Sequence, residues 1–375
     1  MFKPIRHLIG AAILAVLTVA AVGLARFLPD LWFSFYTEFS RGAMRVLGAA
    51  FGWVPVPIWE LLLALLLLAL PAGLIYAVKK ARVLGYLSAV LELAVLLAAL
   101  FMGLWGLNHF APPIGEQTGL EVRPYTVKQL RQAAAWYAGQ ASAWSTQVER
   151  SALGDVLLPE FEDMSQEAVA AYERLAEYEP RFADPAPRVK PLLVSKAFAY
   201  MGTTGVFVCL TGEAAVSTES FALTQPFTVC HELGHSLAVA REDEANYLGF
   251  LACRASQSPL FRYSGYYNAF LYCYNALYEE SPAQARALWA GCSEEMLHDS
   301  SVHVAHNKQY EGKVQQAAQA VNDAYLKTFR EEGLPPRKPL SVSRSATTAC
   351  STSPWPATTC RAPWRTSGCW SASAC

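Results

Sequence analysis

PFTVCHELGHSLAVAREDEANYLGFLAC, residues 226–253, contains two histidines, His231 and His235, with three residues between them. On a helix, residues four apart lie on the same face, so these two imidazoles can supply two corners of a tetrahedral Zn2+ site. Glu232 lies beside the first histidine, where its carboxylate can act as general base toward a metal-activated water without being a ligand. The segment therefore predicts a zinc-dependent catalytic helix.

A third ligand is expected from the acidic residues that follow. Catalytic zinc sites use three protein ligands and leave the fourth position to water. Glu242 opens a second predicted helix seven residues after His235, and it is our first candidate. Glu244 is the alternative, because a small rotation of that helix would exchange the two carboxylates. An acidic helix N-terminus, stabilised by the helix dipole, would explain one of them without any metal.

The same residues resemble two families. The run from Glu242 to Asn246 is similar to the Glu-x-x-Ala-Asp/Asn box that follows HExxH in membrane zinc peptidases of the gluzincin type. That resemblance implies that Glu242 is a ligand and that Asn246 orients a ligand histidine. More closely, the chain resembles a bacterial membrane family catalogued as domain of unknown function 3810, with its TGEA-like strand at residues 211–214. That family usually has glycine where this chain has Ala238.

Three apolar runs occupy the first third of the chain. They cover about residues 8–28, 58–78 and 84–107, and each is close to the ~20 residues that a helix needs to cross a bilayer core. We interpret residues 1–110 as a membrane region with three transmembrane helices, with residues 29–57 as a loop. The membrane bilayer is therefore one expected partner.

Basic residues predict the orientation of these spans. Lys3 and Arg6 precede the first run, and a basic cluster at residues 79–82 separates the second from the third. Because lysine and arginine favour the cytoplasmic side, we expect a cytoplasmic N-terminus in the bacterial plasma membrane. Three crossings then place residues 111–333 outside the cytoplasm.

Residues 111–333 predict an α+β domain that is mainly helical. Helical patterns cover residues 126–147, 166–179 and most of the chain after Phe227. Residues 191–218 are richer in β-branched residues and glycine, which predicts two or three short strands ahead of the HExxH helix. The resemblance implies that this is a zincin-like metallopeptidase domain.

The remaining composition excludes some classes of protein. The net charge of -1 provides no basic face for nucleic acid. The 9 cysteines contain no CxxC pair, so the five in the main body are expected to be small buried residues. Residues 334–375 form an atypical tail without Asp, Glu, Tyr or Phe. We interpret this tail as an out-of-frame reading and assign it no function.

Two features of a substrate cleft can be anticipated. Residues 205–210 read either as an edge strand for an extended peptide or as an interior strand. Glu213 lies either near the cleft or in a structural hydrogen-bond network. A tyrosine or histidine is also expected to stabilise the oxyanion. The candidates are Tyr263, Tyr266, Tyr267, His303 and His306.

Together these patterns predict a membrane-anchored zinc metallohydrolase, most simply an endopeptidase that acts on a protein or peptide substrate. In this hypothesis His231, His235 and Glu242 bind zinc and Glu232 is the general base. The alternative is a non-catalytic membrane sensor or scaffold that keeps zinc for its structure. The intact Glu232 argues against that alternative, because a structural zinc site has no use for a base.

Overall fold

The computed structural model describes residues 3–118 and 124–330. Among them, three helices are long and apolar enough to cross a membrane, as the apolar runs predict. These are α1 (Lys3–Phe27), α3 (Ile58–Lys79) and α4 (Val83–Leu104). The atypical tail at residues 334–375 lies outside the described residues.

The interpretation of residues 29–57 as a loop is wrong. Most of that segment forms α2 (Pro29–Gly52), a helix whose buried residues Tyr36, Ser40, Met44 and Gly48 recur every four positions. This spacing is that of one helical face. Charged and hydroxyl side chains interrupt the apolar residues of α2 elsewhere along the helix, so the segment carries no signal for a membrane span.

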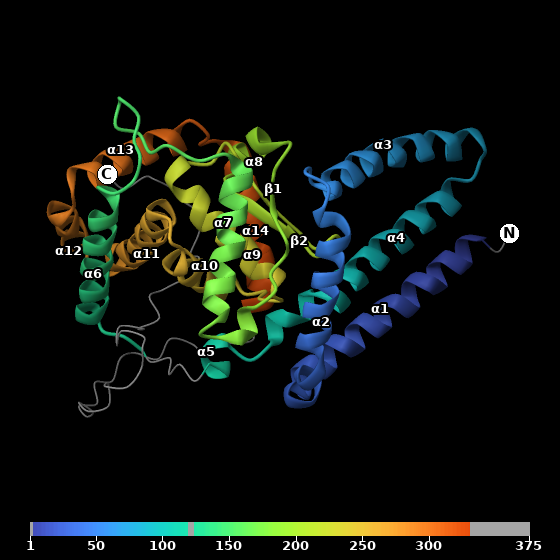
Figure 1. Ribbon diagram of the computed structural model, residues 1–375. Coiled ribbons are helices and arrows are strands. Elements are labelled where there is room, and N and C mark those ends of the chain that lie inside the picture. Colours follow the sequence, from blue (N-terminus) through green and yellow to red (C-terminus); the bar gives the residue numbers. More distant parts are fainter. Residues whose placement is uncertain (1–2, 119–123, 331–375) are drawn as a thin grey trace.

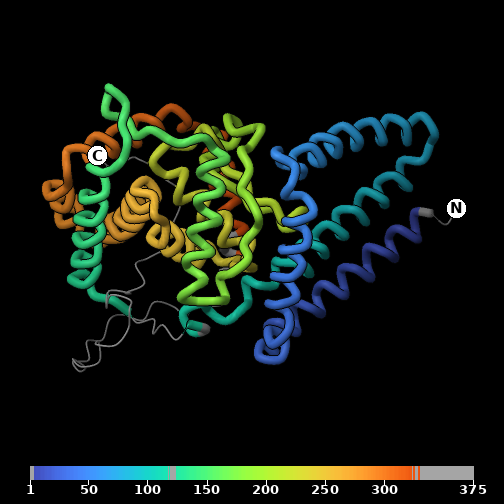
Figure 2. The backbone as a smooth tube through the Cα atoms, viewed as in Figure 1, coloured from blue at the N-terminus to red at the C-terminus, as the bar shows by residue number. Residues whose placement is uncertain are grey.

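The membrane helices project from one side of the helical domain (Figures 1 and 2). Helices α1 and α4 run parallel, since a Cβ on Gly85 would meet Pro4 and one on Gly10 would meet Glu92. Glu92 also contacts the His7 ring across the two helices. As a result, the start of α1 and the α3–α4 connection lie together at the end farthest from the domain (Figure 1).

The rest of the chain is mainly helical with one small sheet, in agreement with the predicted class. Its first helices are α5 (Ile114–Gln117), α6 (Val127–Ser145), α7 (Phe161–Ala176) and α8 (Ser195–Met201); α7 packs against the sheet and α6 against α11. The later helices are α9 (Gln225–Ser236), α10 (Glu242–Ala255), α11 (Pro259–Glu280), α12 (Pro282–Leu288), α13 (Glu294–Lys308) and α14 (Lys313–Arg330). Short 3-10 turns link them: η1 (Gly106–Phe110), η2 (Pro180–Phe182), η3 (Ala222–Thr224) and η4 (Trp289–Gly291).

The sheet has three strands in the order β1-β3-β2. Strand β1 (Val189–Pro191) pairs parallel with β3 (Glu213–Val216), and β2 (Gly205–Val208) pairs antiparallel with the other side of β3. The strands predicted within residues 191–218 are thus present, although helix α8 interrupts them. Strand β2 is at the edge, which decides between the two interpretations of that segment.

A buried ion pair attaches the sheet to the membrane helices. The Lys190 Nζ lies 2.5 Å from the Glu213 Oε1, and both side chains are 1% exposed. The Glu213 carboxylate also accepts hydrogen bonds from the backbone N–H groups of Ile58 and Trp59, at 2.9 and 3.0 Å. These are the unsatisfied donors of the first turn of α3. Glu213 therefore has the structural role, holding the start of the candidate membrane helix α3 against the domain.

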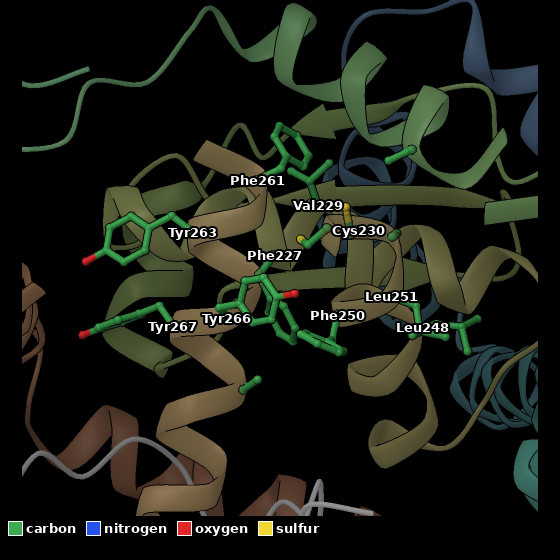
Figure 3. Packing of buried hydrophobic residues seen from close by; sticks show 14 of the residues in the cluster. Phe227, Val229, Cys230, Leu248, Phe250, Leu251, Phe261, Tyr263, Tyr266 and Tyr267 are labelled. Carbon is green, nitrogen blue, oxygen red and sulfur yellow. The ribbon is translucent and has the colours of Figure 1, made fainter. Parts of the chain in front are cut away.

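Helix α11 forms the centre of the hydrophobic core. Tyr263, Tyr267 and Phe270 of this helix are essentially inaccessible to solvent, and they lie in one cluster with residues of α9 and α10 (Figure 3). Cys230 and Cys253 are buried in the same cluster as free thiols, as expected for small apolar residues. This core fixes the relative positions of α9 and α10, the two helices of the HExxH segment.

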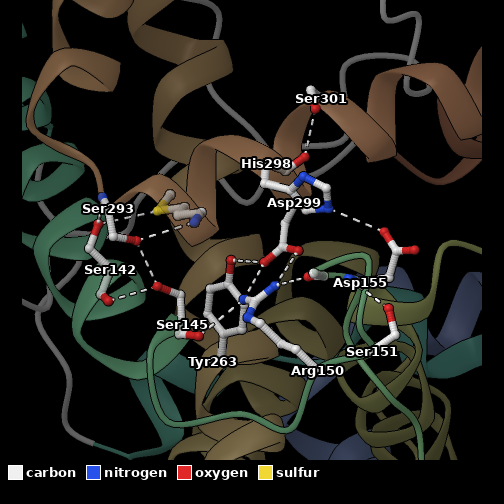
Figure 4. A network of polar contacts seen from close by, with 12 residues as sticks. Ser142, Ser145, Arg150, Ser151, Asp155, Tyr263, Ser293, His298, Asp299 and Ser301 are labelled. Carbon is white, nitrogen blue, oxygen red and sulfur yellow. Dashed lines mark hydrogen bonds and ion pairs between the residues drawn. The ribbon is translucent and has the colours of Figure 1, made fainter.

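A second polar network secures α13 (Figure 4). Arg150 donates two hydrogen bonds to the buried Asp299 carboxylate, at 2.8 and 2.9 Å. The Tyr263 hydroxyl donates to the same carboxylate at 2.7 Å. The bidentate contact with the guanidinium fixes the orientation of Asp299, and with it the position of α13 against the segment that contains Arg150.

Candidate metal centre

Helix α9 presents both histidines on one face. Pro226 occupies its first turn, where a missing N–H costs nothing, and the helix continues to Ser236. His231 and His235 lie one turn apart, and their Nε2 atoms are separated by 3.1 Å. The two rings are nearly perpendicular, which directs both Nε2 atoms toward a common point.

The chain reverses immediately after the second histidine. Ala238 adopts a positive φ of 64°, in the left-handed region that an alanine reaches only at a cost of roughly 1–2 kcal/mol. A glycine at this position would have no such cost. Trp105 supports the helix end, since its Nε1 donates to the His235 carbonyl at 3.0 Å.

Helix α10 brings Glu242 to the histidine pair. Its Oε2 lies 3.3 Å from the His231 Nε2, and its Oε1 lies 3.8 Å from the His235 Nε2. Glu244, the alternative ligand, has other partners: its Oε1 accepts the Ile114 N–H at 2.9 Å and lies 3.6 Å from Arg241. The structure thus brings together one carboxylate and two imidazoles, with ligand atoms within 4.8 Å of one another.

A hydrogen bond orients the His235 imidazole, and Asn246 lies near the His231 imidazole. The His235 Nδ1 lies 2.7 Å from the Val239 carbonyl, so this nitrogen carries the proton and leaves a lone pair on Nε2. The Asn246 side chain lies within hydrogen-bonding range of His231. The His231 Nδ1 and the Asn246 Nδ2 are both buried, and neither has a hydrogen-bond partner. Turning the Asn246 amide by 180° would let its oxygen accept from Nδ1, while its nitrogen would face the Tyr272 hydroxyl.

The electrostatics of these groups are strongly coupled. Burial tends to raise the pKa of Glu242, but its hydrogen bond to His231 and the nearby imidazoles lower that pKa to about 2. Burial lowers the pKa of His235 to about 4. Glu242 is therefore ionised and His235 neutral at neutral pH, which are the forms that bind a metal ion.

Glu232 faces a cavity beside the histidines. The cavity has a volume of about 440 Å³, and its walls include Glu232, both histidines, Glu242 and residues of β2, α13 and α14. Burial raises the pKa of Glu232 to about 8, and the positive charge of a zinc ion held by the neighbouring donors would lower it toward the ionised form that a base requires. Gly205 of β2 allows the carboxylate to lie there, because a Cβ on this glycine would be 2.5 Å from the Glu232 Oε1.

The chemistry and spacing of the three donor residues can be compared with those of a tetrahedral zinc site. Zinc bonds of ~2.0–2.2 Å to nitrogen and oxygen place tetrahedral ligand atoms about 3.3–3.6 Å apart. The two Nε2 atoms are 3.1 Å apart and the Glu242 Oε2 is 3.3 Å from the His231 Nε2, both near that range. The 3.8 Å approach to the His235 Nε2 is made by the other carboxylate oxygen, Oε1, and with one ligand atom per residue all three atoms lie within 4.8 Å of one another. Two neutral imidazoles with one carboxylate are also a donor set of hydrolytic zinc sites. The residues present could therefore hold zinc and leave one position open to the cavity.

Only some of the residues expected to stabilise an oxyanion line the cavity. His303 and His306 line the cavity, whereas Tyr263, Tyr266 and Tyr267 are buried in the core. His303 is stacked on Phe221, with ring centroids 4.4 Å apart. Sequence reasoning missed three tyrosines of the cavity wall, Tyr272, Tyr310 and Tyr325. None has a local signal, because each reaches the site only through packing of the segment that carries it.

A family model described as "Protein of unknown function (DUF3810)" matches residues 35–334. The chain belongs to this family. The match spans most of α2 and the whole helical domain, so the TGEA strand and both helices of the HExxH segment lie within the DUF3810 region. No curated protein and no solved structure matches this DUF3810 chain.

Proposed function

We propose that this DUF3810 protein is a membrane-anchored, zinc-dependent hydrolase of peptide bonds, most simply an endopeptidase with a gluzincin-like site. One observation carries the proposal. His231, His235 and Glu242 converge as a donor set for zinc, and Glu232 faces the same cavity without joining that set.

Each residue has a distinct role in the proposed reaction. Zinc held by His231, His235 and Glu242 would supply Lewis acidity, lowering the pKa of a water toward ~7 and polarising the substrate carbonyl. Glu232 accepts a proton from the attacking water as its oxygen bonds to the carbonyl carbon. Glu232 then returns that proton to the amide nitrogen as the C–N bond breaks. The products are one carboxylate and one amine, and Asn246 holds the His231 ring in position.

The cavity supports catalysis over a purely structural zinc site. A structural site is normally closed by four protein ligands. Here the three donor residues border a cavity of about 440 Å³. Gly205 leaves room in it for the carboxylate of Glu232, which is not one of the three donors. The non-catalytic sensor or scaffold is therefore the less supported alternative.

We also propose that the helical domain lies outside the cytoplasm. The basic cluster at residues 79–82 and the start of α1 lie at the same end of the membrane helices, opposite the domain. A cytoplasmic location of that end would satisfy the positive-inside rule. In right-side-out vesicles, a cysteine at the exposed Gln132 should react with an impermeant maleimide, whereas one at Lys80 should react only after permeabilisation. The reverse pattern would overturn this orientation.

The decisive test of the activity is Glu232→Gln in the full-length protein. The variant should bind one zinc per chain, as measured by elemental analysis, and should lose roughly 1,000-fold or more in the rate of peptide release. His235→Ala should lose both zinc and hydrolysis. Hydrolysis by Glu232→Gln at the wild-type rate, or no zinc in the wild-type protein, would refute the proposal.

A further inference from the structure

The cavity of the candidate site reaches the end of a membrane helix. Phe101 belongs to the last turn of α4, and Trp105 follows the end of that helix; both line the same cavity as His231 and Glu232. Trp105 also contacts helix α9 directly, with its ring centroid 5.7 Å from that of His235. At 1.5 Å per residue, Phe101 is only about 5 Å from the end of α4. The site is therefore at the membrane surface if α4 spans the bilayer.

Strand β2 connects Glu232 to this membrane end of the cavity. Gly205 lies against the Glu232 carboxylate, and Phe207 lies two residues further along the strand. The Phe207 ring centroid is 5.9 Å from that of Trp105. Two strand residues span about 7 Å. A peptide extended along β2 would thus pass from Glu232 to the membrane end within a few residues.

The outer edge of β2 has backbone groups available for such a peptide. The Ser217 N–H donates to the Thr204 carbonyl, and these two residues are directly opposite in the antiparallel register. In an antiparallel pair, bonded positions alternate, so Val206 also bonds to β3. The N–H and C=O groups of Gly205 and Phe207 therefore point away from β3, toward the edge that carries no further strand among the described residues.

Aromatic side chains gather at the end of the cavity beside α4. Phe101, Trp105 and Phe207 make the membrane end aromatic. Elsewhere in the wall the Tyr310 hydroxyl donates to the Glu219 carboxylate at 3.0 Å, and amide and hydroxyl side chains are mixed with Phe221 and Met201. Aromatic residues are typical of the membrane interface and polar residues of the aqueous side. The aromatic cluster beside α4 thus suits a chain that leaves the bilayer at this end of the cavity.

From these features we infer that the substrate is a membrane-anchored polypeptide. The segment that emerges from its span adds to β2 as an extended strand, and hydrolysis occurs within about five residues of the bilayer. The inference rests on the proposed function, because it assigns a substrate class to the same site. It excludes soluble peptides and distant parts of large domains as preferred substrates.

A matched substrate series tests the inference. Full-length zinc-loaded protein is reconstituted in phospholipid vesicles with model single-span proteins that carry a randomised segment of about 12 residues, long enough to cover β2. In the first set the segment directly follows the span. In the second a Gly/Ser spacer of about 20 residues separates them, and in the third the segment is a soluble peptide. Mass spectrometry of the released fragments gives the cut positions and rates, and Glu232→Gln serves as the inactive control.

The outcomes separate the inference from the proposed function. In the first set we expect cuts within about five residues of the span. In the other two sets we expect the randomised segment to be cleaved at least roughly tenfold more slowly than in the first set. Equal rates in all three sets, or cuts spread over distant positions, would overturn the inference and leave the hydrolase intact. Absence of Glu232-dependent cleavage in every set would overturn the proposed function itself.

Discussion

Gly205→Ala is a substitution that should remove activity without unfolding the protein. A Cβ at this position would lie 2.5 Å from the Glu232 Oε1, 2.8 Å from its Cγ and 2.9 Å from its Cδ. Ordinary contact requires at least 3.4 Å. The carboxylate must therefore move by about 1 Å, which a flexible side chain beside a cavity can do at little cost in stability.

The effect on the reaction should be much larger than the effect on folding. A displacement of about 1 Å in a reacting group costs about 100-fold in rate, which corresponds to about 2.7 kcal/mol of activation free energy. We expect kcat to fall by that factor while zinc content and the thermal unfolding midpoint stay near those of the wild type. The assay is peptide release by the reconstituted protein, combined with elemental analysis and thermal unfolding.

The matched control is Gly139→Ala on α6. A Cβ at Gly139 would meet no atom within 4 Å, and this position is exposed in a helix. Alanine there should stabilise the helix by up to about 1 kcal/mol and leave activity unchanged. A Gly205→Ala protein with wild-type kcat would refute the assignment of Glu232 as the base. Equal losses of kcat in Gly205→Ala and Gly139→Ala would show that the assay reports folding and not the position of Glu232.

Contacts of single residues give three further predictions. Ala238→Gly should raise the unfolding free energy by about 1 kcal/mol, because glycine adopts the positive φ without strain; an unchanged or lower thermal midpoint would contradict this. Glu213→Gln should cost about 3 kcal/mol by leaving the Lys190 ammonium buried and unpaired. Adding Lys190→Met to Glu213→Gln should reverse at least half of the decrease in the thermal unfolding midpoint. No recovery of the midpoint would argue against the ion pair. Asn246→Ala should weaken zinc binding about 10–100-fold in a chelator competition, whereas wild-type affinity would show that it does not orient His231.

The membrane helices and the histidine face could be anticipated because their signals are local. Apolar runs of about 20 residues predict α1, α3 and α4 without knowledge of their partners. The His231 and His235 spacing likewise places both imidazoles on one face of any helix that contains them. Helix α2 was missed for the opposite reason. Its buried residues face other helices and the domain, so its role depends on contacts that its own composition does not display.

The position of Glu242 rather than Glu244 beside the histidines depends on packing between helices. Sequence periodicity places each carboxylate around the axis of α10, but it does not say how α10 is rotated relative to α9. The structure fixes that rotation through the shared core and through Ile114, whose N–H binds Glu244. Glu244 thus accepts a hydrogen bond from a residue 130 positions away in the chain, and no local sequence pattern could reveal this contact.

By itself, then, the sequence determined which residues have the chemistry to bind a metal and which segments are apolar enough to enter a bilayer. Only the tertiary structure decided that β2 is an edge strand, that Gly205 makes room for Glu232, and that Trp105 joins the end of α4 to helix α9. The physical reason is the range of the forces involved. Side-chain chemistry and helix periodicity act within a few residues, whereas the shape of a cavity results from close packing of segments far apart in the chain.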